Sequence, residues 1–374
     1  MSVPTTPLIR SGSTVCEPSD RKAGLPVAVH LVPFDGIGGV EVAARTTPDA
    51  ALPQFHFRKL YLLDDPYIAA NAQNATTTPP RRVLDHPRVY WDALQRLRRL
   101  GPRLVIASLW RSCAVAIVLK LLRPSTKVVT FLHLATDVHL ADKWLNTIAM
   151  WLSTEVWADS QATLDARVSQ RLRGRTRVIS FLVERQAPPE PRAPSPRFVF
   201  WGRLHPQKGL ARALRLFALI HAQRADAEFL VIGPDGGQRR ALEEQVASLG
   251  LSGAVRFAGG MDRAAIFALA RELSFYLQTS EVEGMAMSVI EAMQLGLVPV
   301  VTPVGEIRRY CQDGANAVLV SDDEAAARHA VALIADAETF QRMASAAVQT
   351  WQAKRLYRED LMGACQELVA KRSK

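Results

Sequence analysis

Short apolar runs rich in Val, Ile, Leu and Phe recur along the chain, and each run is followed by a segment whose apolar residues repeat with helical spacing. Continuous apolar runs of this kind are typical of parallel strands buried on both faces, with the intervening helices covering them. The runs are residues 27–34, 57–63, 104–109, 128–134, 156–160 and 178–183 in the first half, and 198–202, 228–233, 255–258, 274–278, 298–302 and 317–320 in the second. The pattern predicts an α/β protein with two doubly wound units.

The chain of 374 residues is long enough for two domains of ordinary size. A proline-rich segment separates the two groups of runs and contains Pro188, Pro189, Pro191, Pro194 and Pro196. Because proline interrupts helices and central strands, we interpret residues 187–197 as an interdomain linker. The predicted organisation is a flexible arm (1–26), a first Rossmann-like domain (27–186), the linker, a second Rossmann-like domain (198–345), and a C-terminal helix (346–374) that packs on a domain surface, with the first domain as a candidate.

Positive charge is concentrated in the first half of the chain. Residues 1–186 hold 24 basic and 15 acidic side chains (net +9), whereas the remaining residues hold 22 and 21 (net +1). The densest region is residues 81–123, whose basic side chains are Arg81, Arg82, Arg88, Arg96, Arg98, Arg99, Arg103, Arg111, Lys120 and Arg123. Apolar residues interleave with them at roughly helical spacing, namely Tyr90, Trp91, Leu94, Leu97 and Leu100. The pattern predicts a basic amphipathic surface.

Such a surface has three possible explanations: it binds nucleic acid, it binds a membrane, or it is a solvated helix face without a partner. Nucleic acid is not expected, because charge is the only recognition feature that the sequence offers. An ordinary solvated helix face is an alternative. We favour an anionic membrane surface through residues 81–123, because lysine and arginine are attracted to acidic lipid headgroups.

The location that we expect is cytoplasmic, with peripheral attachment to the inner face of the cell membrane as the further expectation from the basic surface. The first 26 residues contain no continuous apolar segment of the kind that secretory signals have. The apolar stretch 104–122 is interrupted by Arg111 and Lys120, which disfavours a membrane span. The four cysteines are irregularly spaced, as is typical of reduced thiols.

The densest chemical signal lies in residues 281–303, where seven residues separate Glu283 from Glu291. A strand is expected to end near Thr279 and a helix to begin near Met287. Unpaired N–H groups at such a helix start can bind a phosphate, and here they belong to Gly284, Met285, Ala286 and Met287. Glu291, within the helix, could accept hydrogen bonds from a vicinal diol such as ribose. The alternative is that both glutamates only complement the helix dipole.

Two further turns follow predicted strands of the same domain. Arg203 and Lys208 come after the strand that ends at Gly202, and two cations there suit a diphosphate. Gly233 and Pro234 begin a second turn. An isolated arginine and lysine on a loop are more often solvated surface charges. Their combination with an anion-binding helix start, however, predicts one nucleotide-diphosphate site.

Residues 198–320 resemble the donor-binding domain of the retaining glycosyltransferase family 4, whose members have the GT-B fold. The resemblance rests on Gly202-Arg203-Leu204, Lys208-Gly209, Gly233-Pro234 and the pair Glu283 and Glu291 in the frame E-G-x-x-x-x-x-x-E-A. Ala286 and Met285 depart from the family, which usually has Gly and often Phe at these positions. The methyl group of Ala286 narrows the space beside the sugar, and the donor's identity stays open.

The resemblance implies roles for individual residues. Arg203 and Lys208 would hold the donor diphosphate together with the N–H groups of residues 284–287, Glu291 would hold the ribose, and Gly233 and Pro234 would line the nucleotide. Glu283 and His133 would be the catalytic residues that contact the transferred sugar. His133 closes the run 128–134, and His139 is the second candidate for the cleft-facing histidine. Gly38 and Gly39 resemble the loop that faces the phosphates and acceptor, although an ordinary strand-to-helix turn explains them equally well.

The activity implied is transfer of a hexose from a UDP- or GDP-sugar, with retention, to a glycan or polyprenyl-diphosphate-linked acceptor at the cytosolic membrane face, in cell-surface polysaccharide or lipopolysaccharide biosynthesis. No metal or cofactor is expected, because the chain has no Asp-x-Asp motif. A non-catalytic nucleotide-sugar-binding or scaffold protein of the same fold is the alternative. A dehydrogenase is disfavoured, because no G-x-G-x-x-G follows the first strand.

Overall fold

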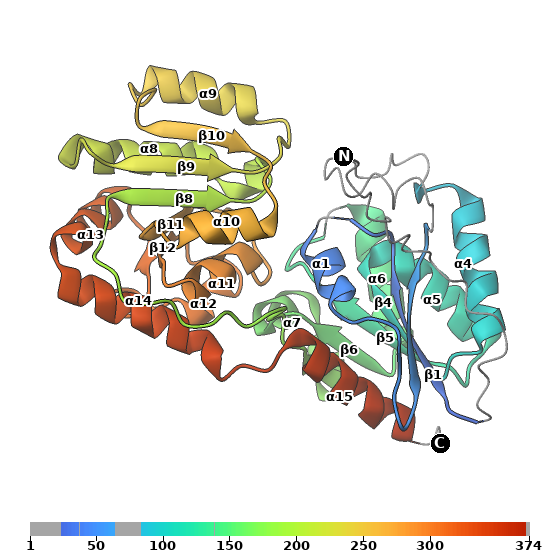
Figure 1. Cartoon of the computed structure of the whole chain (residues 1–374). Helices are drawn as coiled ribbons and strands as arrows, with labels where there is room; N and C mark the ends of the chain where they lie inside the picture. Colours follow the sequence, from blue (N-terminus) through green and yellow to red (C-terminus); the bar gives the residue numbers. More distant parts are fainter. Residues whose placement is uncertain (1–23, 37, 64–83, 138, 372–374) are drawn as a thin grey trace, which may run out of the picture.

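Two β-sheets, each covered by helices, build the molecule (Figure 1). The computed structural model describes residues 24–36, 38–63, 84–137 and 139–371. Within these ranges the first sheet has the strand order β2-β3-β1-β4-β5-β6-β7 and the second has the order β10-β9-β8-β11-β12-β13. All neighbouring strands pair in parallel except β2 with β3. The predicted pair of doubly wound α/β units is confirmed.

The first sheet contains β1 (Val27–Val32), β2 (Ala50–Ala51), β3 (His56–Tyr61), β4 (Leu104–Ser108), β5 (Lys127–Leu132), β6 (Glu155–Ala158) and β7 (Thr176–Val178). Its helical segments are α1 (Gly39–Arg45), α4 (Pro87–Leu100), α5 (Leu109–Leu122), α6 (Leu140–Leu152), α7 (Gln161–Arg167) and the 3₁₀ turn η3 (Gln170–Arg175). Helices α4, α5 and α6 pack on one face of the sheet, and α1 packs on the other. We call this sheet and its helices the first lobe.

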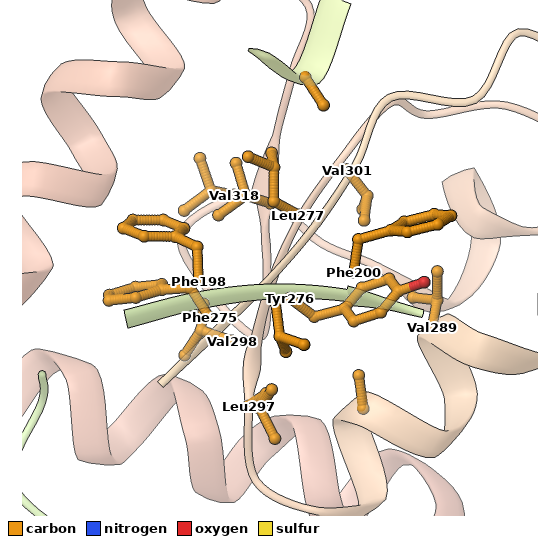
Figure 2. Close-up of a cluster of buried hydrophobic side chains, with 14 of the residues drawn as sticks. Phe198, Phe200, Phe275, Tyr276, Leu277, Val289, Leu297, Val298, Val301 and Val318 are labelled. Carbon is orange, nitrogen blue, oxygen red and sulfur yellow. The ribbon is translucent and has the colours of Figure 1, made fainter. Parts of the chain in front are cut away.

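The second sheet contains β8 (Arg197–Trp201), β9 (Glu228–Ile232), β10 (Val255–Gly259), β11 (Phe275–Gln278), β12 (Val298–Val301) and β13 (Val318–Leu319). Its helical segments are η4 (Pro206–Lys208), α8 (Leu210–Gln223), α9 (Arg239–Ser248), α10 (Arg263–Ala270), α11 (Met287–Gln294), α12 (Ile307–Tyr310), α13 (Asp323–Ala335) and α14 (Ala337–Gln352). Figure 2 shows its core, where Phe198 stacks on Phe275 and Val289 of α11 lies beside Tyr276. We call this unit the second lobe.

The last helix, α15 (Tyr357–Ala370), packs on the first lobe although it follows the second in sequence (Figure 1). Its buried side chains Leu361, Cys365 and Leu368 belong to the same apolar cluster as strand residues of β1, β4 and β5. The helix covers the face opposite α4 and α5. The chain therefore crosses between the lobes twice.

The apolar run 178–183 differs from its expected form as a strand. Strand β7 ends at Val178, and the following residues have no regular structure. Phe181 and Leu182 are nevertheless buried. Their backbone is bound by α15 instead of by a strand, because the N–H of Tyr357 donates to the Leu182 carbonyl oxygen at 2.7 Å. An irregular segment that is buried against a helix can be as apolar as a buried strand, so composition alone does not distinguish the two.

The basic region 81–123 is less amphipathic toward solvent than its sequence suggests. Leu94 and Leu97 of α4 are buried on the first sheet, whereas Trp91 and Leu100 are 59% and 40% exposed, so only part of the predicted apolar face is core. The Arg96 guanidinium donates to the carbonyl oxygens of residues 61 and 62, and Arg111 pairs with Asp85 at 2.8 Å. Arg81 and Arg82 lie outside the described residues, as does most of the N-terminal arm 1–26. None of the helices in the described ranges is both long and apolar enough to cross a membrane.

Candidate active site

The carboxyl edges of the two sheets face each other, and the loops that leave them meet. A methyl group added at Gly284, after β11, would lie only 2.7 Å from the carbonyl oxygen of His133, after β5. One added at Gly39, at the start of α1, would lie 3.0 Å from Sδ of Met287. Ligands of open α/β sheets bind outside the carboxyl ends of the strands. The structure therefore brings four of the predicted site residues to one place.

Glu283 is the most firmly held side chain at this edge. Its Oε1 accepts hydrogen bonds from Lys208 Nζ at 2.7 Å, Ser280 Oγ at 2.7 Å and Gln278 Nε2 at 3.1 Å. The side chain is buried. A pocket of about 450 Å³ opens beside it, between α7 of the first lobe and α12 of the second. Three donors on one oxygen fix a carboxylate, so Glu283 is preorganised beside a space that a small ligand could fill.

A buried polar chain lies behind Glu283. The amide oxygen of Gln278 accepts from the Tyr276 hydroxyl at 2.7 Å and from Ser288 Oγ at 3.1 Å, while its Nε2 donates to Glu283. Tyr276 and Gln278 are 0 % exposed. Buried polar chains in which each donor is matched to an acceptor hold their members rigidly. Residues of β11 and of α11 thus jointly orient Glu283.

Glu291 lies one turn into α11, and both of its carboxylate oxygens accept hydrogen bonds. Its Oε2 accepts from Trp201 Nε1 at 3.0 Å and its Oε1 from Arg263 Nε at 2.9 Å. Burial raises the pKa of Glu291, and the Arg263 charge and the Trp201 hydrogen bond oppose this rise. Arg263 also pairs with Glu184 of the interlobe segment. The carboxylate is therefore held in place by β8 and α10.

The start of α11 has an unusual backbone. Ala286, its N-cap, has φ 53° and ψ 67°, the left-handed conformation that favours glycine. Leu109, which follows β4 at the same kind of edge, has φ 66°. Within the described ranges these are the only non-glycine residues with positive φ. Strained backbone collects at functional sites because the surrounding structure must enforce it.

Arg203 and the turn after β9 lie on the second-lobe side of the cleft. The Arg203 side chain is exposed, and its charge acts on Glu41 of α1 in the first lobe. Burial raises the pKa of Glu41, and the charges of Arg45 and Arg203 oppose this rise. Gly233 has φ 154°, and a methyl group there would overlap the Gly202 carbonyl oxygen, so the two loops require a glycine to approach. Pro234 follows in the same turn and accepts from the Leu204 N–H at 3.0 Å.

His133 is buried at the end of β5 and faces a second histidine through a serine. Its Nε2 lies 3.0 Å from Ser108 Oγ, which lies 2.8 Å from Nε2 of His30. Burial lowers the pKa of each imidazole to about 3, and His30 lowers that of His133 further. Nδ1 of both rings is buried, and no hydrogen-bond partner for it lies among the residues that the structure describes. Both histidines are therefore neutral at physiological pH.

His139, the second candidate, lies at the start of α6 and caps that helix. It is the N-cap of α6, where its Nδ1 accepts from the N–H of Asp142 at 3.0 Å, and its ring lies edge-on to Trp110. Between the two candidates, His133 is the one whose main chain touches the Gly284 loop. Gly38 is the N-cap of α1, and the Glu41 carboxylate folds back over it.

Asp159 is a second residue of the first lobe that lies against Gly284. Its Oδ2 would lie 3.1 Å from a methyl group at Gly284, and its Oδ1 accepts from the hydroxyls of Ser160 and Thr163. Burial raises the pKa of Asp159 to about 7. The carboxyl is therefore partly protonated near neutral pH, which favours its close contact with the other lobe.

Several residues at this edge of the sheets belong to no sequence motif, so they could not be identified as site residues from the sequence. Ser108 and His30 lie at buried strand positions, where a polar residue is usually a satisfied core group. Arg263 follows Asp262, a helix N-cap, and nothing in its spacing relates it to Glu291. Asp159 closes β6 in the same way that His133 closes β5, so its position after an apolar strand was the one available signal.

Comparison with known proteins extends these observations. Residues 184–350 match the family model described as Glycosyl transferases group 1. The GDP-mannose:cellobiosyl-diphosphopolyprenol alpha-mannosyltransferase of Komagataeibacter xylinus is 30% identical over 136 residues, which cover 36% of this chain and 35% of that protein. The protein of that name from Xanthomonas campestris is 26% identical over 199 residues, 52% of each chain. The chain thus spans about a third to a half of the length of these relatives.

Solved structures resemble the whole molecule. Anabaena HepE in complex with UDP has a TM-score of 0.73 at 18% identity, covering 93% of this chain and 100% of that one. Sucrose-phosphate synthase from Thermosynechococcus elongatus has a TM-score of 0.70 at 17% identity, covering 91% and 98%. These likenesses confirm the predicted GT-B architecture of two Rossmann-like units facing a cleft. Residues 184–350 thus carry the sequence pattern of the group 1 glycosyl transferases, on a polypeptide with the GT-B fold.

Proposed function

We propose that this protein is a glycosyltransferase that moves a hexose from a nucleoside-diphosphate sugar to a glycan or polyprenyl-diphosphate-linked acceptor. The observation that carries the proposal is Glu283, held by Lys208, Ser280 and Gln278 where the two lobes meet. Relatives named for GDP-mannose and a diphosphopolyprenol acceptor favour a GDP-sugar and a lipid-linked glycan over other members of these classes.

In this proposal the donor lies along the edge of the second sheet. Arg203 and Lys208 hold the diphosphate together with the N–H groups of residues 284–287, the ribose binds Glu291, and Gly233 and Pro234 line the nucleotide. Gly38 and Gly39 face the phosphates and acceptor from the first lobe. The Lys208 ammonium has two N–H donors beyond the one that it gives to Glu283, so it can bind both groups.

The chemistry is cleavage of the bond between the sugar's anomeric carbon and the phosphate oxygen. The bonding electrons leave with the diphosphate, whose growing negative charge is stabilised by Arg203, Lys208 and the start of α11. The acceptor hydroxyl attacks the anomeric carbon from the leaving-group face, which gives retention, and its proton passes to the departing phosphate oxygen. Glu283 and the neutral His133 contact the sugar. A neutral imidazole binds hydroxyls without placing positive charge beside a developing oxocarbenium ion.

We also propose that the reaction needs no metal ion or cofactor, because Arg203 and Lys208 would neutralise the diphosphate charge as a divalent ion does in other enzymes. Transfer should persist in excess chelator, and restoration of activity by added Mg²⁺ or Mn²⁺ alone would contradict it. We place the reaction at the cytosolic face of the membrane, where polysaccharide precursors on polyprenyl carriers are elongated. Residues 81–123 would contribute electrostatic attraction to acidic lipids.

Two variants test the assignment of roles. Glu283→Gln should lower transfer by at least about a hundredfold, because a preorganised charge at the reacting sugar is lost. Its affinity for the nucleoside diphosphate should stay near that of the unmodified protein. Arg203→Ala should weaken that affinity by roughly ten- to hundredfold, because a charged hydrogen bond to phosphate is lost. Calorimetric titration with GDP and UDP and a radiolabelled transfer assay give the two readouts.

Matched controls are Glu272→Gln and Arg256→Ala, which alter exposed residues of the second lobe away from the cleft. Full transfer by Glu283→Gln would remove this residue from catalysis. Nucleotide binding without any transfer in the unmodified chain, across GDP- and UDP-sugars and lipid-linked acceptors, would favour the alternative of a nucleotide-sugar-binding scaffold.

A further inference from the structure

Large apolar side chains are exposed on two neighbouring helices of the first lobe. Of the thirteen exposed ones in the described residues, seven lie on α5 and α6. Those of α5 are Val118, Leu121 and Leu122, and those of α6 are Leu140, Trp144, Ile148 and Trp151. Helices α5 and α6 pack against each other, so their outer surfaces adjoin. We call these seven residues the apolar face.

The four residues of α6 form one stripe, because spacings of four, four and three positions return to the same side of a helix. Their exposed fractions are 75% for Leu140, 64% for Trp144, 44% for Ile148 and 50% for Trp151. Singly exposed apolar residues are ordinary, but a continuous group with two tryptophans indicates an interaction surface.

The exposed charges on α5 and α6 and directly after α5 are basic, and Asp137, shortly before α6, is paired with Arg167. Asp142 is the only acidic residue of α5 and α6, and it is buried. Lys143, next to Trp144, and Arg123, directly after α5, are exposed. Arg175 donates to carbonyl oxygens at the C-terminal end of α6. An apolar patch with a cationic rim is complementary to a bilayer that contains acidic lipids.

The apolar face also has a defined relation to the cleft. Helix α6 follows β5 through residues 133–139, so its first turn lies at the carboxyl edge of the first sheet. Leu140 and Trp144 are therefore at the cleft end of the stripe, on the segment that leads from His133. A surface bound through them would lie beside the opening between the lobes.

We propose that the apolar face enters the headgroup region of an anionic lipid bilayer. Tryptophan is enriched at that depth, and lysine can extend from it toward phosphates. A second copy of the chain fits less well, because a two-fold contact would bring the rims around Lys143 and Arg123 of both copies together. The inference goes beyond the proposed transfer reaction and does not depend on it. It shares the end of α5 with the basic region 81–123, but it adds apolar insertion, centred on α6, to electrostatic attraction.

Flotation of the full chain with vesicles of phosphatidylglycerol and phosphatidylcholine tests the proposal. The double variant Leu140→Ser, Trp144→Ser should lower the partition coefficient by about tenfold or more, because the removed side chains each contribute substantially to insertion. Leu219→Ser on α8 and Trp91→Ser on α4 are the matched controls and should bind like the unmodified chain. Brominated lipids should quench the fluorescence of the unmodified chain more than that of Trp144→Phe. The thermal unfolding midpoint should be unchanged in every variant, which shows that they are folded, and GDP affinity is recorded on the same samples.

Four results would overturn the proposal. The unmodified chain could fail to float with acidic vesicles at low salt. The double variant could bind as well as the controls, or Trp91→Ser could be the variant that loses binding, which would place the surface on α4. Light scattering could show a dimer that the double variant dissociates, which would identify the face as a protein interface. Because nucleotide binding is measured on the same samples, none of these results is confused with failure of the transferase proposal.

Discussion

A serine between two buried histidines is the least expected arrangement of residues in the first lobe. Ser108 can donate one hydrogen bond, so at least one of the two imidazoles must donate to it. The serine thereby couples the tautomers of His30 and His133, and among the described residues Nδ1 of each ring has no hydrogen-bond partner. Leu109, directly after Ser108, has the left-handed backbone conformation, with φ 66°.

The buried histidines predict a pH dependence of stability. His30 has an ordinary value of 6.5 that burial lowers to a pKa of about 3, so between these values the unfolded chain binds the proton and the folded chain does not. Its contribution is complete above about pH 6.5 and is lost as pH falls toward 3. His30→Asn removes this loss. Between about pH 6.5 and pH 5, the free energy of unfolding of the unmodified chain should therefore fall by about 2 kcal/mol more than that of the variant.

Urea unfolding at several pH values measures this difference. Comparison of two chains cancels Asp159, whose raised pKa of about 7 acts in the opposite direction and destabilises the fold as pH rises. The exposed His139, changed to Asn in the same way, is the control. Parallel pH curves for His30→Asn and the unmodified chain would show that His30 is not the buried neutral base described here.

At the scale of elements, the loop from β11 to α11 joins the lobes through a contact that only glycine allows. Gly284→Ala places a methyl group 2.7 Å from the His133 carbonyl oxygen, so the lobes must move apart. Groups from both lobes act on one sugar in the proposed reaction. The variant should therefore lose at least about tenfold in transfer, while the free energy of unfolding falls by only about 1–3 kcal/mol.

Transfer assays and thermal unfolding of the same preparation separate these two effects. Gly253→Ala is the matched control, because no heavy atom lies within 4 Å of a methyl group at that position. If Gly284→Ala transferred sugar at the rate of the control, the close contact between the lobes would have no part in the reaction.

A separate prediction concerns helix α15. Its apolar side chains are part of the core of the first sheet, although the helix follows the second lobe in sequence. Leu361 is 0 % exposed and lies in the apolar cluster of the first sheet. Leu361→Ala should lower the free energy of unfolding by about 2–5 kcal/mol through the cavity that it leaves. Gln366→Ala, on the exposed side of the same helix, should change it by less than about 0.5 kcal/mol. Denaturant melts followed by circular dichroism compare the two, and equal midpoints would show that α15 is only loosely attached.

For the molecule as a whole, the fold was predictable and much of the cleft was not. Buried parallel strands are continuous apolar runs, so most of them could be located from composition. Glu283, Lys208 and Gly284 could be proposed as site residues because they combine, in one predicted domain, into a motif that resembles that of a known family. The contacts of Glu291 with Arg263 and of His133 with Ser108 join distant segments whose residue types have no fixed spacing. The apolar face was missed because apolar residues on a helix are ordinarily interpreted as core.

The double crossing of the chain between the lobes has a consequence for biosynthesis. The first sheet is complete at Val178, but the helix that covers one of its faces begins at Tyr357. At a typical rate of synthesis, about 10–40 s separate the appearance of these two residues. During that time the part of this apolar face that α15 covers is exposed, while the second lobe is still being made. The first lobe is thus translated before the second lobe but completed after it. Nascent chains should therefore depend on a chaperone that binds apolar surface until α15 emerges.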